Sequence, residues 1–266
     1  AYISIAVTYS QMENFNNAEI YFNKGIDLLR KTTDSIALAS ALLNAGDTYF
    51  NNKKYDAALI NFEESGHIFR KSNYLIGTAY NKGNVGMVYA EQGKDVLAEK
   101  NINEAITILE ELQDYYPISV YLTYMADIYF RNNDQTTAFN YAKRSLELAQ
   151  KHGLKEQISE ANLKLSELYE KAGNQVASYK HYKDYIAYRD SVINIKDIQQ
   201  MANLRTNYEV SQKQIEVDLL EKESEIQQLK EKRQKQIIYA TAIVSVLIFL
   251  LSLGLYRRNK FIQKTK

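Results

Sequence analysis

The sequence predicts an all-α protein, a solenoid built of helical hairpins. Three observations lead to this prediction: the 266 residues include a single proline, tyrosine occurs 22 times, and one tyrosine recurs every forty residues. A chain with one proline has little to interrupt its helices. Many tyrosines suit helix interfaces in which a ring is buried and its hydroxyl reaches the edge. A fixed period of this length is typical of repeat architectures.

The forty-residue period is carried by five tyrosines and by small residues at fixed distances from them. A small residue stands three positions before each tyrosine, as Gly46 and Gly86 do, and another stands nine positions after it, as Ala58 and Ala98 do. Between them lie turn signals such as NNKKYD and EQGKDV, whose asparagine or glycine tolerates a left-handed backbone. Each unit is therefore expected to be two antiparallel helices, the first beginning about fourteen residues before its tyrosine. The tyrosines are Tyr9, Tyr49, Tyr89, Tyr129 and Tyr169.

Residues 46–65, GDTYFNNKKYDAALINFEES, resemble the tetratricopeptide repeat (TPR). The pattern of that family is small–x–x–Tyr in the first helix and Ala–x3–aromatic–x2–small in the second. The resemblance covers residues 1–190 and implies a TPR-type α-solenoid of five helix hairpins. The usual TPR period is about 34 residues, and the period of forty resembles a longer-helix variant found in some peptide-pheromone receptors. Only eight residues precede Tyr9, so we expect a cut first helix and further repeats upstream.

Beyond the repeats, residues 191–236 are expected to form a helical, coiled-coil linker. Residues 196–236 contain neither proline nor glycine, and seven of twelve heptad seam positions are apolar, which suits a marginal coiled coil. We expect a homodimer through 196–236; the alternative is one long helix that folds back on the repeats. The apolar seam positions are Ile198, Met201, Tyr208, Ile215, Leu219, Ile226 and Leu229.

The stretch IIYATAIVSVLIFLLSLGLY, residues 237–256, contains no charged residue. Its length is the one that a helix needs to cross about 30 Å of hydrocarbon, so we expect one transmembrane helix there. Residues 257–266 carry five cations and no acid. They are expected to begin a truncated cytoplasmic segment, because cations are enriched on that side of a membrane.

Composition and motifs argue against several classes of chemistry. A formal net charge of +1 points to no nucleic-acid partner. The absence of cysteine removes disulfides, zinc fingers and thiol nucleophiles. The three histidines do not stand at metal-ligand spacing, and the sequence has neither a glycine-rich phosphate loop nor a GxSxG motif. We therefore expect no catalytic residue, no metal and no cofactor in this chain.

The TPR resemblance implies that the first helices line a concave groove that binds an extended protein or peptide segment. In chaperone-binding TPR proteins a basic clamp grips a C-terminal carboxylate, but Leu43 and Gly83 stand here where that clamp has lysine. Acidic Asp47, Asp127 and Glu167 favour a basic or neutral segment instead. For each position, the alternative is a solvated residue or one that covers the next repeat. The implied groove residues are Asp47, Phe50, Tyr80, Asn84, Met87, Asp127, Phe130, Arg131, Leu163 and Glu167.

The order of TPR array, charged helix, single span and basic YRRNK resembles bacterial TPR-containing, membrane-bound sensor histidine kinases, with residues 187–266 carrying the likeness. This implies the sensory region of a single-pass protein of the bacterial inner membrane, with a periplasmic array and a cytoplasmic C-terminus. The output domain, absent here, is expected to be the histidine kinase of a two-component system rather than a nucleotide cyclase or a helix-turn-helix regulator. The alternative is a tail-anchored TPR adaptor that recruits partners to a membrane.

Overall fold

The computed structural model describes the backbone of residues 1–264 and the side chains of residues 1–192, 213, 215–239, 241 and 254. The chain divides into two compact units, residues 1–195 and 196–266. Every element of the described backbone is a helix. These are α1 (Tyr2–Gln11), α2 (Phe15–Leu29), α3 (Ser35–Asn51), α4 (Tyr55–Lys71), α5 (Leu75–Glu91), α6 (Asp95–Glu111), α7 (Tyr115–Arg131), α8 (Gln135–Lys151), α9 (Lys155–Lys171) and α10 (Gln175–Lys264).

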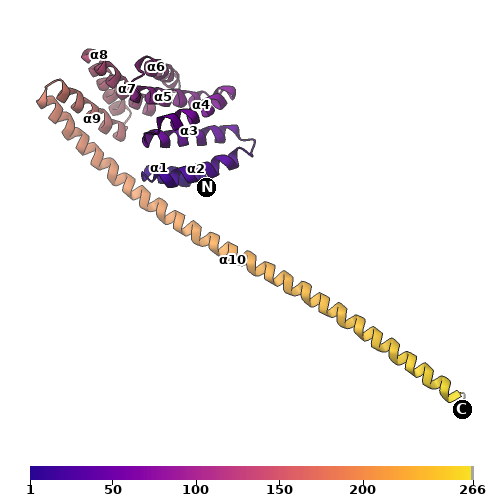
Figure 1. Cartoon of the computed structure of the whole chain (residues 1–266). Helices are drawn as coiled ribbons and strands as arrows, with labels where there is room; N and C mark the ends of the chain where they lie inside the picture. The colour runs from indigo at the N-terminus through magenta and orange to yellow at the C-terminus, as the bar shows by residue number, and fades with distance from the viewer. Residues whose placement is uncertain (265–266) are drawn as a thin grey trace. The chain divides into compact units, whose positions relative to one another are not determined.

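The helices of the first unit form antiparallel hairpins that repeat every forty residues (Figure 1). Each helix from α3 to α9 has 17 residues, and the turns between them have three. Two helices and two turns therefore account for the period. Helix α5 begins at Leu75, fourteen residues before Tyr89, which confirms the expected helix start. Helix α1 has 10 residues and α2 has 15.

The three-residue turns share one backbone geometry. The middle residue has a positive φ, which is +70° at Gly93, and the residue after it, Lys94, donates its N–H to the carbonyl oxygen of Tyr89 at 2.8 Å. This hydrogen bond pairs one of the backbone carbonyl groups that are left free at the C-terminus of a helix. Glycine suits the middle position because it has no Cβ to strain, yet Lys53 and Gln113 also adopt it, each with a φ of 57°. The backbone conformation of the turns is therefore more uniform than their amino-acid sequences.

Small residues bring the two helices of a hairpin together, as the repeat pattern predicts. A Cβ added to Gly46 would overlap the ring of Phe62, and one added to Gly86 would lie 2.7 Å from Cγ1 of Ile102. Phe62 and Ile102 are both fully buried. The absence of a side chain at each glycine thus leaves the space that a large side chain of the partner helix fills.

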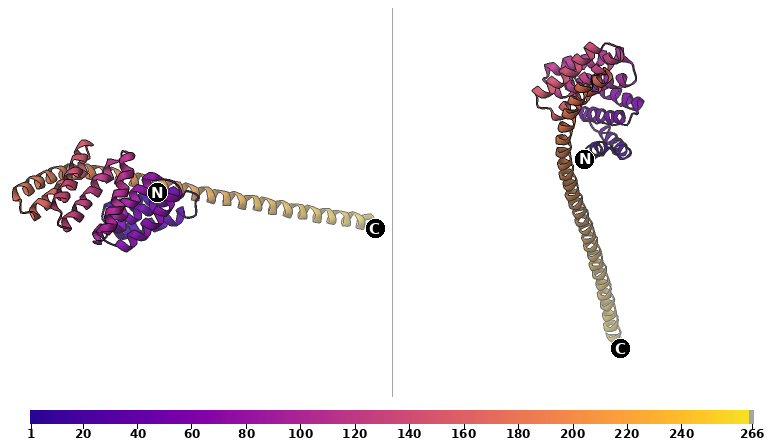
Figure 2. Two further views of the ribbon diagram at one scale, coloured as in Figure 1. Left: turned by 90° about the horizontal axis from the view of Figure 1, so that it is seen from above. Right: turned by 90° about the vertical axis from the view of Figure 1, so that its left-hand side faces the viewer.

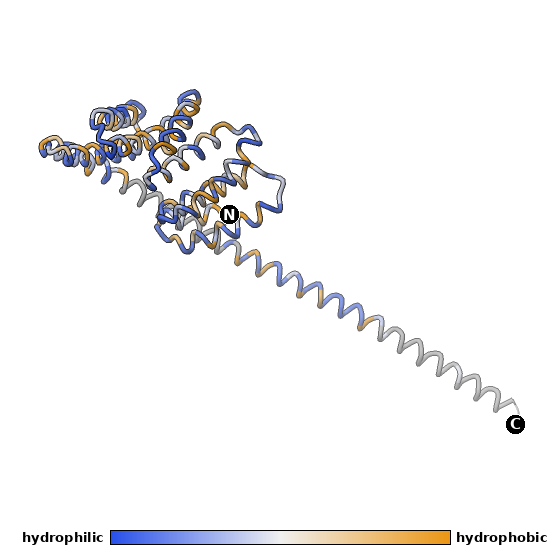
Figure 3. Tube along the Cα trace, turned by 45° about the horizontal axis from the view of Figure 1, so that its top comes forward, coloured by the Kyte–Doolittle hydropathy of each residue, from blue (hydrophilic) through white to orange (hydrophobic). Residues whose placement is uncertain are grey.

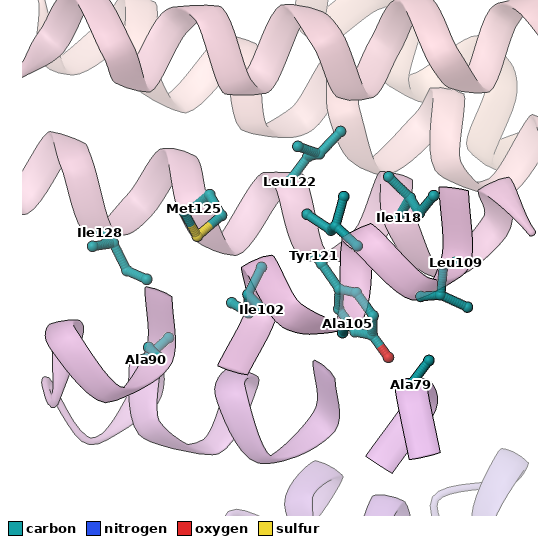
Figure 4. Close-up of a cluster of buried hydrophobic side chains, with 12 residues drawn as sticks. Ala79, Ala90, Ile102, Ala105, Leu109, Ile118, Tyr121, Leu122, Met125 and Ile128 are labelled. Carbon is teal, nitrogen blue, oxygen red and sulfur yellow. The ribbon is translucent and has the colours of Figure 1, made fainter. Parts of the chain in front are cut away.

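Hydrophilic and hydrophobic residues are interspersed along the helices of the first unit (Figure 3). The largest cluster of buried side chains joins α5, α6 and α7 (Figure 4). Tyr121 is only 2% exposed within it. Figure 4 shows its ring beside Ala105 and its hydroxyl directed toward α5 at Ala79. The core is therefore continuous from one hairpin to the next, as expected of a solenoid.

The first helices of successive hairpins lie closer together than the second helices do. Among the fully described helices, α1 contacts α3, α3 contacts α5, α5 contacts α7 and α7 contacts α9 through Cα atoms within 8 Å, whereas consecutive even-numbered helices from α2 to α8 have no Cα atoms that close. An array built this way curves toward its odd-numbered helices. Figure 2 shows the hairpins from two further sides. We call the exposed side of α3, α5, α7 and α9 the inner face.

The second unit consists of the remainder of α10. The described seam residues Ile215, Leu219, Ile226 and Leu229 are 51%, 58%, 51% and 66% exposed; the other apolar seam residues lie outside the described side chains. Within the described part of the chain, we find no helix long and apolar enough to span a bilayer. The stretch predicted to do so, 237–256, lies outside that part except at 237–239, 241 and 254.

Candidate functional site

One polar network crosses three first helices on the inner face. The Asn84 amide on α5 donates to Oδ1 of Asp47 on α3 at 2.6 Å and accepts from the hydroxyl of Tyr121 on α7 at 2.9 Å. Surrounding atoms desolvate the Asp47 carboxylate and raise its pKa to about 7, although the Asn84 hydrogen bond opposes the rise. At neutral pH, Asp47 therefore carries only part of a negative charge.

The same network closes the place where a basic clamp would stand. Gly83 lies directly beneath the Tyr121 ring, so that an added Cβ would overlap it. Leu43 is 9% exposed and belongs to the core around Phe62. A buried leucine and the ring of Tyr121 therefore fill the two places at which the clamp has lysine.

A second network joins α7 to α9. The ammonium of Lys164 donates to Oδ2 of Asp127 at 2.7 Å and to Oε2 of Glu167 at 3.0 Å. Burial lowers the pKa of Lys164, but the two carboxylates outweigh burial and raise it above its ordinary value. This part of the inner face therefore holds a paired cation between two acids.

A cavity of about 250 Å³ opens on the inner face between α7 and α9, with the C-terminal end of α5 at its rim. Three carboxylates line it and only one ammonium, so its formal charge is negative. Ser119 is 1% exposed, and its hydroxyl oxygen has no hydrogen-bond partner among the described residues. The polar lining residues are Glu91, Ser119, Asp127, Gln157, Glu160 and Lys164.

An aromatic group flanks this cavity. Tyr124 lines it, and the Tyr124 ring lies 6.3 Å from that of Phe50 on α3. Phe50 in turn lies 5.9 Å from the ring of Tyr55, whose hydroxyl donates to Oε2 of Glu91 at 3.3 Å. Burial, and then the charge of Glu91, raises the pKa of Tyr124, so that its hydroxyl stays protonated. Rings and carboxylates thus meet across α3, α5 and α7.

The other predicted groove residues have separate surroundings. Tyr80 donates its hydroxyl to Oδ2 of Asp114 at 2.9 Å, at the start of α7. Arg131 donates to the carbonyl oxygen of Ala90 at 3.0 Å and to Oδ1 of Asp95 at 2.7 Å. Tyr80 thus ties α5 to the start of α7, and Arg131 ties α7 to the end of α5 and the start of α6.

The remaining three residues add apolar surface and one cation contact. Met87 packs beside the Tyr121 core cluster. Lys171 places its ammonium 5.6 Å from the centre of the Phe130 ring. Leu163 is half-buried on α9. The structure therefore places Asp47 with Asn84, and Asp127 with Glu167 through Lys164. Tyr80 and Arg131 contact the ends of neighbouring helices instead.

Several lining residues of the cavity do not appear in the groove predicted from the sequence. The forty-residue register does contain a signal for two of them, because Tyr124 and Lys164 occupy the position of Asn44 and Asn84 in later repeats. Ser119 gives no such signal. A serine in a helix is indistinguishable from any other small residue in the sequence until its burial and hydrogen bonds are known.

The Tetratricopeptide repeat family model matches residues 1–71 and 75–151, which is more than half of the chain. No curated protein matches the sequence.

Three crystal structures have a similar fold. BtubC (BKLC) from P. vanneervenii is 18% identical, with a TM-score of 0.58 over 71% of this chain and 79% of its own. A Rap protein complexed with Competence and Sporulation Factor is 16% identical, with a TM-score of 0.65 over 70% of this chain, which spans 52% of the Rap chain. A putative kinesin light chain of Podosopora anserina is 13% identical, with a TM-score of 0.54 over 73% of this chain and 95% of its own. At these identities the likeness concerns the fold alone.

Proposed function

The chain belongs to the tetratricopeptide repeat family, an interaction scaffold rather than an enzyme, and from this premise we propose that its inner face binds an extended protein or peptide segment. The observation that carries the proposal is the cavity between α7 and α9, which combines carboxylates with the half-buried aromatic residue Tyr124. Specific binding sites join an apolar surface to a few placed polar groups. The Rap protein of similar fold was solved in complex with a factor, which adds support by analogy.

Panning a displayed heptapeptide library against the whole chain tests this proposal. A selected peptide is then titrated into the wild type and into Phe50→Ala, with the thermal midpoint of each protein measured in parallel. We expect Phe50→Ala to weaken binding about tenfold, because aromatic anchors dominate such interfaces. Ile60→Ala, at a 67% exposed position on α4, is the control and should change the affinity less than about twofold. Equal affinity for all three proteins, or a library without binders, would refute the proposal.

Beyond peptide binding, we propose that the chain is the sensory region of a single-pass protein of the bacterial inner membrane. Its array would be periplasmic and would signal through α10 to a cytoplasmic output domain, for which a histidine kinase is preferred. Support comes from the uncharged stretch 237–256 and the cations after it. Retention of the chain in carbonate-washed membranes, and its loss with Leu247→Arg and Leu251→Arg, tests the span. A soluble wild-type chain would contradict it.

We also propose that the exposed seam of α10 pairs two copies of the chain. Leu229 is 66% exposed although it is apolar, and such a stripe is typical of a coiled-coil partner. The chain has no cysteine, so a single cysteine reports one position. Leu229→Cys should form a disulfide dimer in membranes, whereas Ser224→Cys, five positions earlier and off the seam, should form far less. Failure of Leu229→Cys to cross-link would remove the dimer.

A further inference from the structure

The cavity between α7 and α9 has the size of one side chain rather than of a whole small molecule. Its volume is about 250 Å³, whereas sites for small-molecule ligands span roughly 300–1,000 Å³. It also exceeds by several fold the roughly 30 Å³ that one water occupies in the liquid. The cavity therefore suits a single large side chain projecting from a longer ligand.

The charges around the cavity select a cation. Glu91, Asp127 and Glu160 line it from three different helices, and Lys164 is the single basic residue in its lining. Lys164 already donates to Asp127 at 2.7 Å and to Glu167 at 3.0 Å. An additional cation brings the local charge closer to neutral, whereas an additional carboxylate would raise the repulsion.

The hydroxyl of Ser119 supplies an independent observation. Ser119 is 1% exposed, it lines the cavity, and its oxygen lacks a hydrogen-bond partner among the described residues. A buried hydroxyl without a partner is unfavourable. At the equivalent position forty residues later, Ser159 donates to the carbonyl oxygen of Tyr185 at 3.3 Å. The repeat therefore satisfies this hydroxyl in one hairpin and, in the other, leaves it buried without a described partner in a residue that lines the cavity.

The shape of the lining distinguishes a guanidinium from an ammonium. Acceptor-bearing residues on α5, α7 and α9 line the cavity together with Tyr124. A guanidinium has five donors in one plane and stacks on aromatic rings, and it is more weakly hydrated than an ammonium. The ammonium of Lys164 already takes the compact site beside Asp127. A second ammonium would compete for that site, whereas a planar group reaches several acceptors at once.

We infer that this cavity holds the arginine side chain of the bound segment, with its guanidinium on the Tyr124 ring and between Glu91, Glu160 and the hydroxyl of Ser119. The inference rests on the proposed binding of a peptide by the inner face. The peptide backbone then continues along the inner face toward Phe50, whose ring lies 6.3 Å from that of Tyr124.

The first test uses the peptide selected against the whole chain. It is resynthesised with arginine replaced by citrulline, which keeps the shape and removes the charge, or by lysine. We expect citrulline to weaken binding at least about tenfold and lysine to weaken it about threefold. Agmatine, a free guanidinium compound, should compete only at concentrations about a hundredfold above the peptide's own dissociation constant. Competition at the peptide's own concentration would overturn the assignment to a peptide side chain.

The second test separates ligand contact from structural support. Ser119→Ala should weaken binding of the arginine peptide about threefold without lowering the thermal midpoint, because it removes a hydroxyl that lacks a partner. Its matched control is Ser159→Ala, which should lower the midpoint and leave the affinity unchanged. Glu160→Gln should weaken binding about tenfold, whereas Glu111→Gln, at an exposed position on α6, should not.

The outcomes distinguish the inference from the proposal beneath it. If no peptide binds, both fail. If peptides bind but lack arginine, or bind equally well with citrulline, the arginine site alone is refuted. The site is also refuted if Ser119→Ala loses affinity only in step with a falling thermal midpoint.

Discussion

The inner face contains the same interaction twice, and the two copies differ in charge. In each copy a residue on one first helix contacts the residue 37 positions earlier on the preceding first helix: Asn84 contacts Asp47, and Lys164 contacts Asp127. Asn84 supplies only an amide, so desolvation dominates and the pKa of Asp47 rises to about 7. Lys164 supplies a full positive charge instead. The repeat therefore sets where two side chains meet, and the residue type sets the charge that results.

Because of this difference, the negative charge of the inner face is greater at its α7–α9 end than at its α3–α5 end. Near neutral pH, Asp47 is partly protonated, which weakens the negative charge around α3 and α5. Glu91, Asp127 and Glu160 surround the cavity at α7 and α9. A cationic ligand is therefore expected to settle at the α7–α9 end.

The largest expected effect on stability comes from filling the space above Gly83, which the ring of Tyr121 occupies. Gly83→Ala places a Cβ inside the Tyr121 ring, and Tyr121 is too deeply buried to move freely. We expect the free energy of unfolding to fall by about 2–3 kcal/mol, as for other overpacked cores. Urea unfolding measures the loss. In a Tyr121→Ala background the same glycine substitution should cost much less, and a purely additive result would contradict this explanation.

Asp47→Asn tests the charge of the first copy through its pH dependence. The raised pKa means that the contribution of Asp47 to stability is full below about pH 4 and is lost as the pH rises through about 7. Asparagine is neutral throughout and keeps an oxygen for the Asn84 amide. At pH 8 the variant should be more stable than the wild type by about 1–2 kcal/mol, and near pH 4 the two should match. An Asp47→Asn protein that is less stable at pH 8 would contradict the pKa assignment.

Lys164→Met tests the charge of the second copy. The methionine keeps most of the side-chain volume but leaves Asp127 and Glu167 without their shared cation. Urea unfolding should show a loss of about 1 kcal/mol. The arginine peptide should bind about threefold more tightly, because the only cation in the lining has gone. Weaker peptide binding at unchanged stability would show that Lys164 is a ligand contact rather than a competitor.

The smallest expected effect is the salt dependence of the coupling free energy, which should differ between the two pairs. Raising sodium chloride from about 0.1 M to 1 M shortens the Debye length from about 10 Å to 3 Å. A double-mutant cycle on Asp127 and Lys164 should lose a few tenths of a kcal/mol of coupling, because the pair is partly exposed. The cycle on Asp47 and Asn84, measured near pH 5, should not change. Equal losses in both cycles would remove the distinction between them.

The fold of the array was predictable because its signal is repeated five times. Tyrosines at a spacing of forty and small residues at fixed offsets specify two helices per unit, and the observed helix starts agree. The turns were harder to foresee, because Lys53 and Gln113 adopt a left-handed backbone that their residue types disfavour. There the geometry of the packed helices overrides the local preference.

The candidate site was predictable in outline but not in detail. The acidic residues of the inner face follow from the register, and the structure pairs Asp127 with a cation that the register also contains. What the sequence does not reveal is burial. The pKa of Asp47 near 7 and the hydroxyl of Ser119 without a partner both depend on atoms from neighbouring helices. A one-dimensional pattern does not contain that information.

The most direct test of this account compares the two acids by their effect on one ligand. The selected arginine peptide is titrated calorimetrically, at pH 6, into the wild type, Asp47→Asn and Asp127→Asn. At that pH Asp47 is mostly protonated, so its replacement should change the affinity less than about twofold, whereas Asp127→Asn should weaken binding about tenfold. A loss with Asp47→Asn that equals or exceeds the loss with Asp127→Asn would contradict the assignment of the cation site to the α7–α9 end.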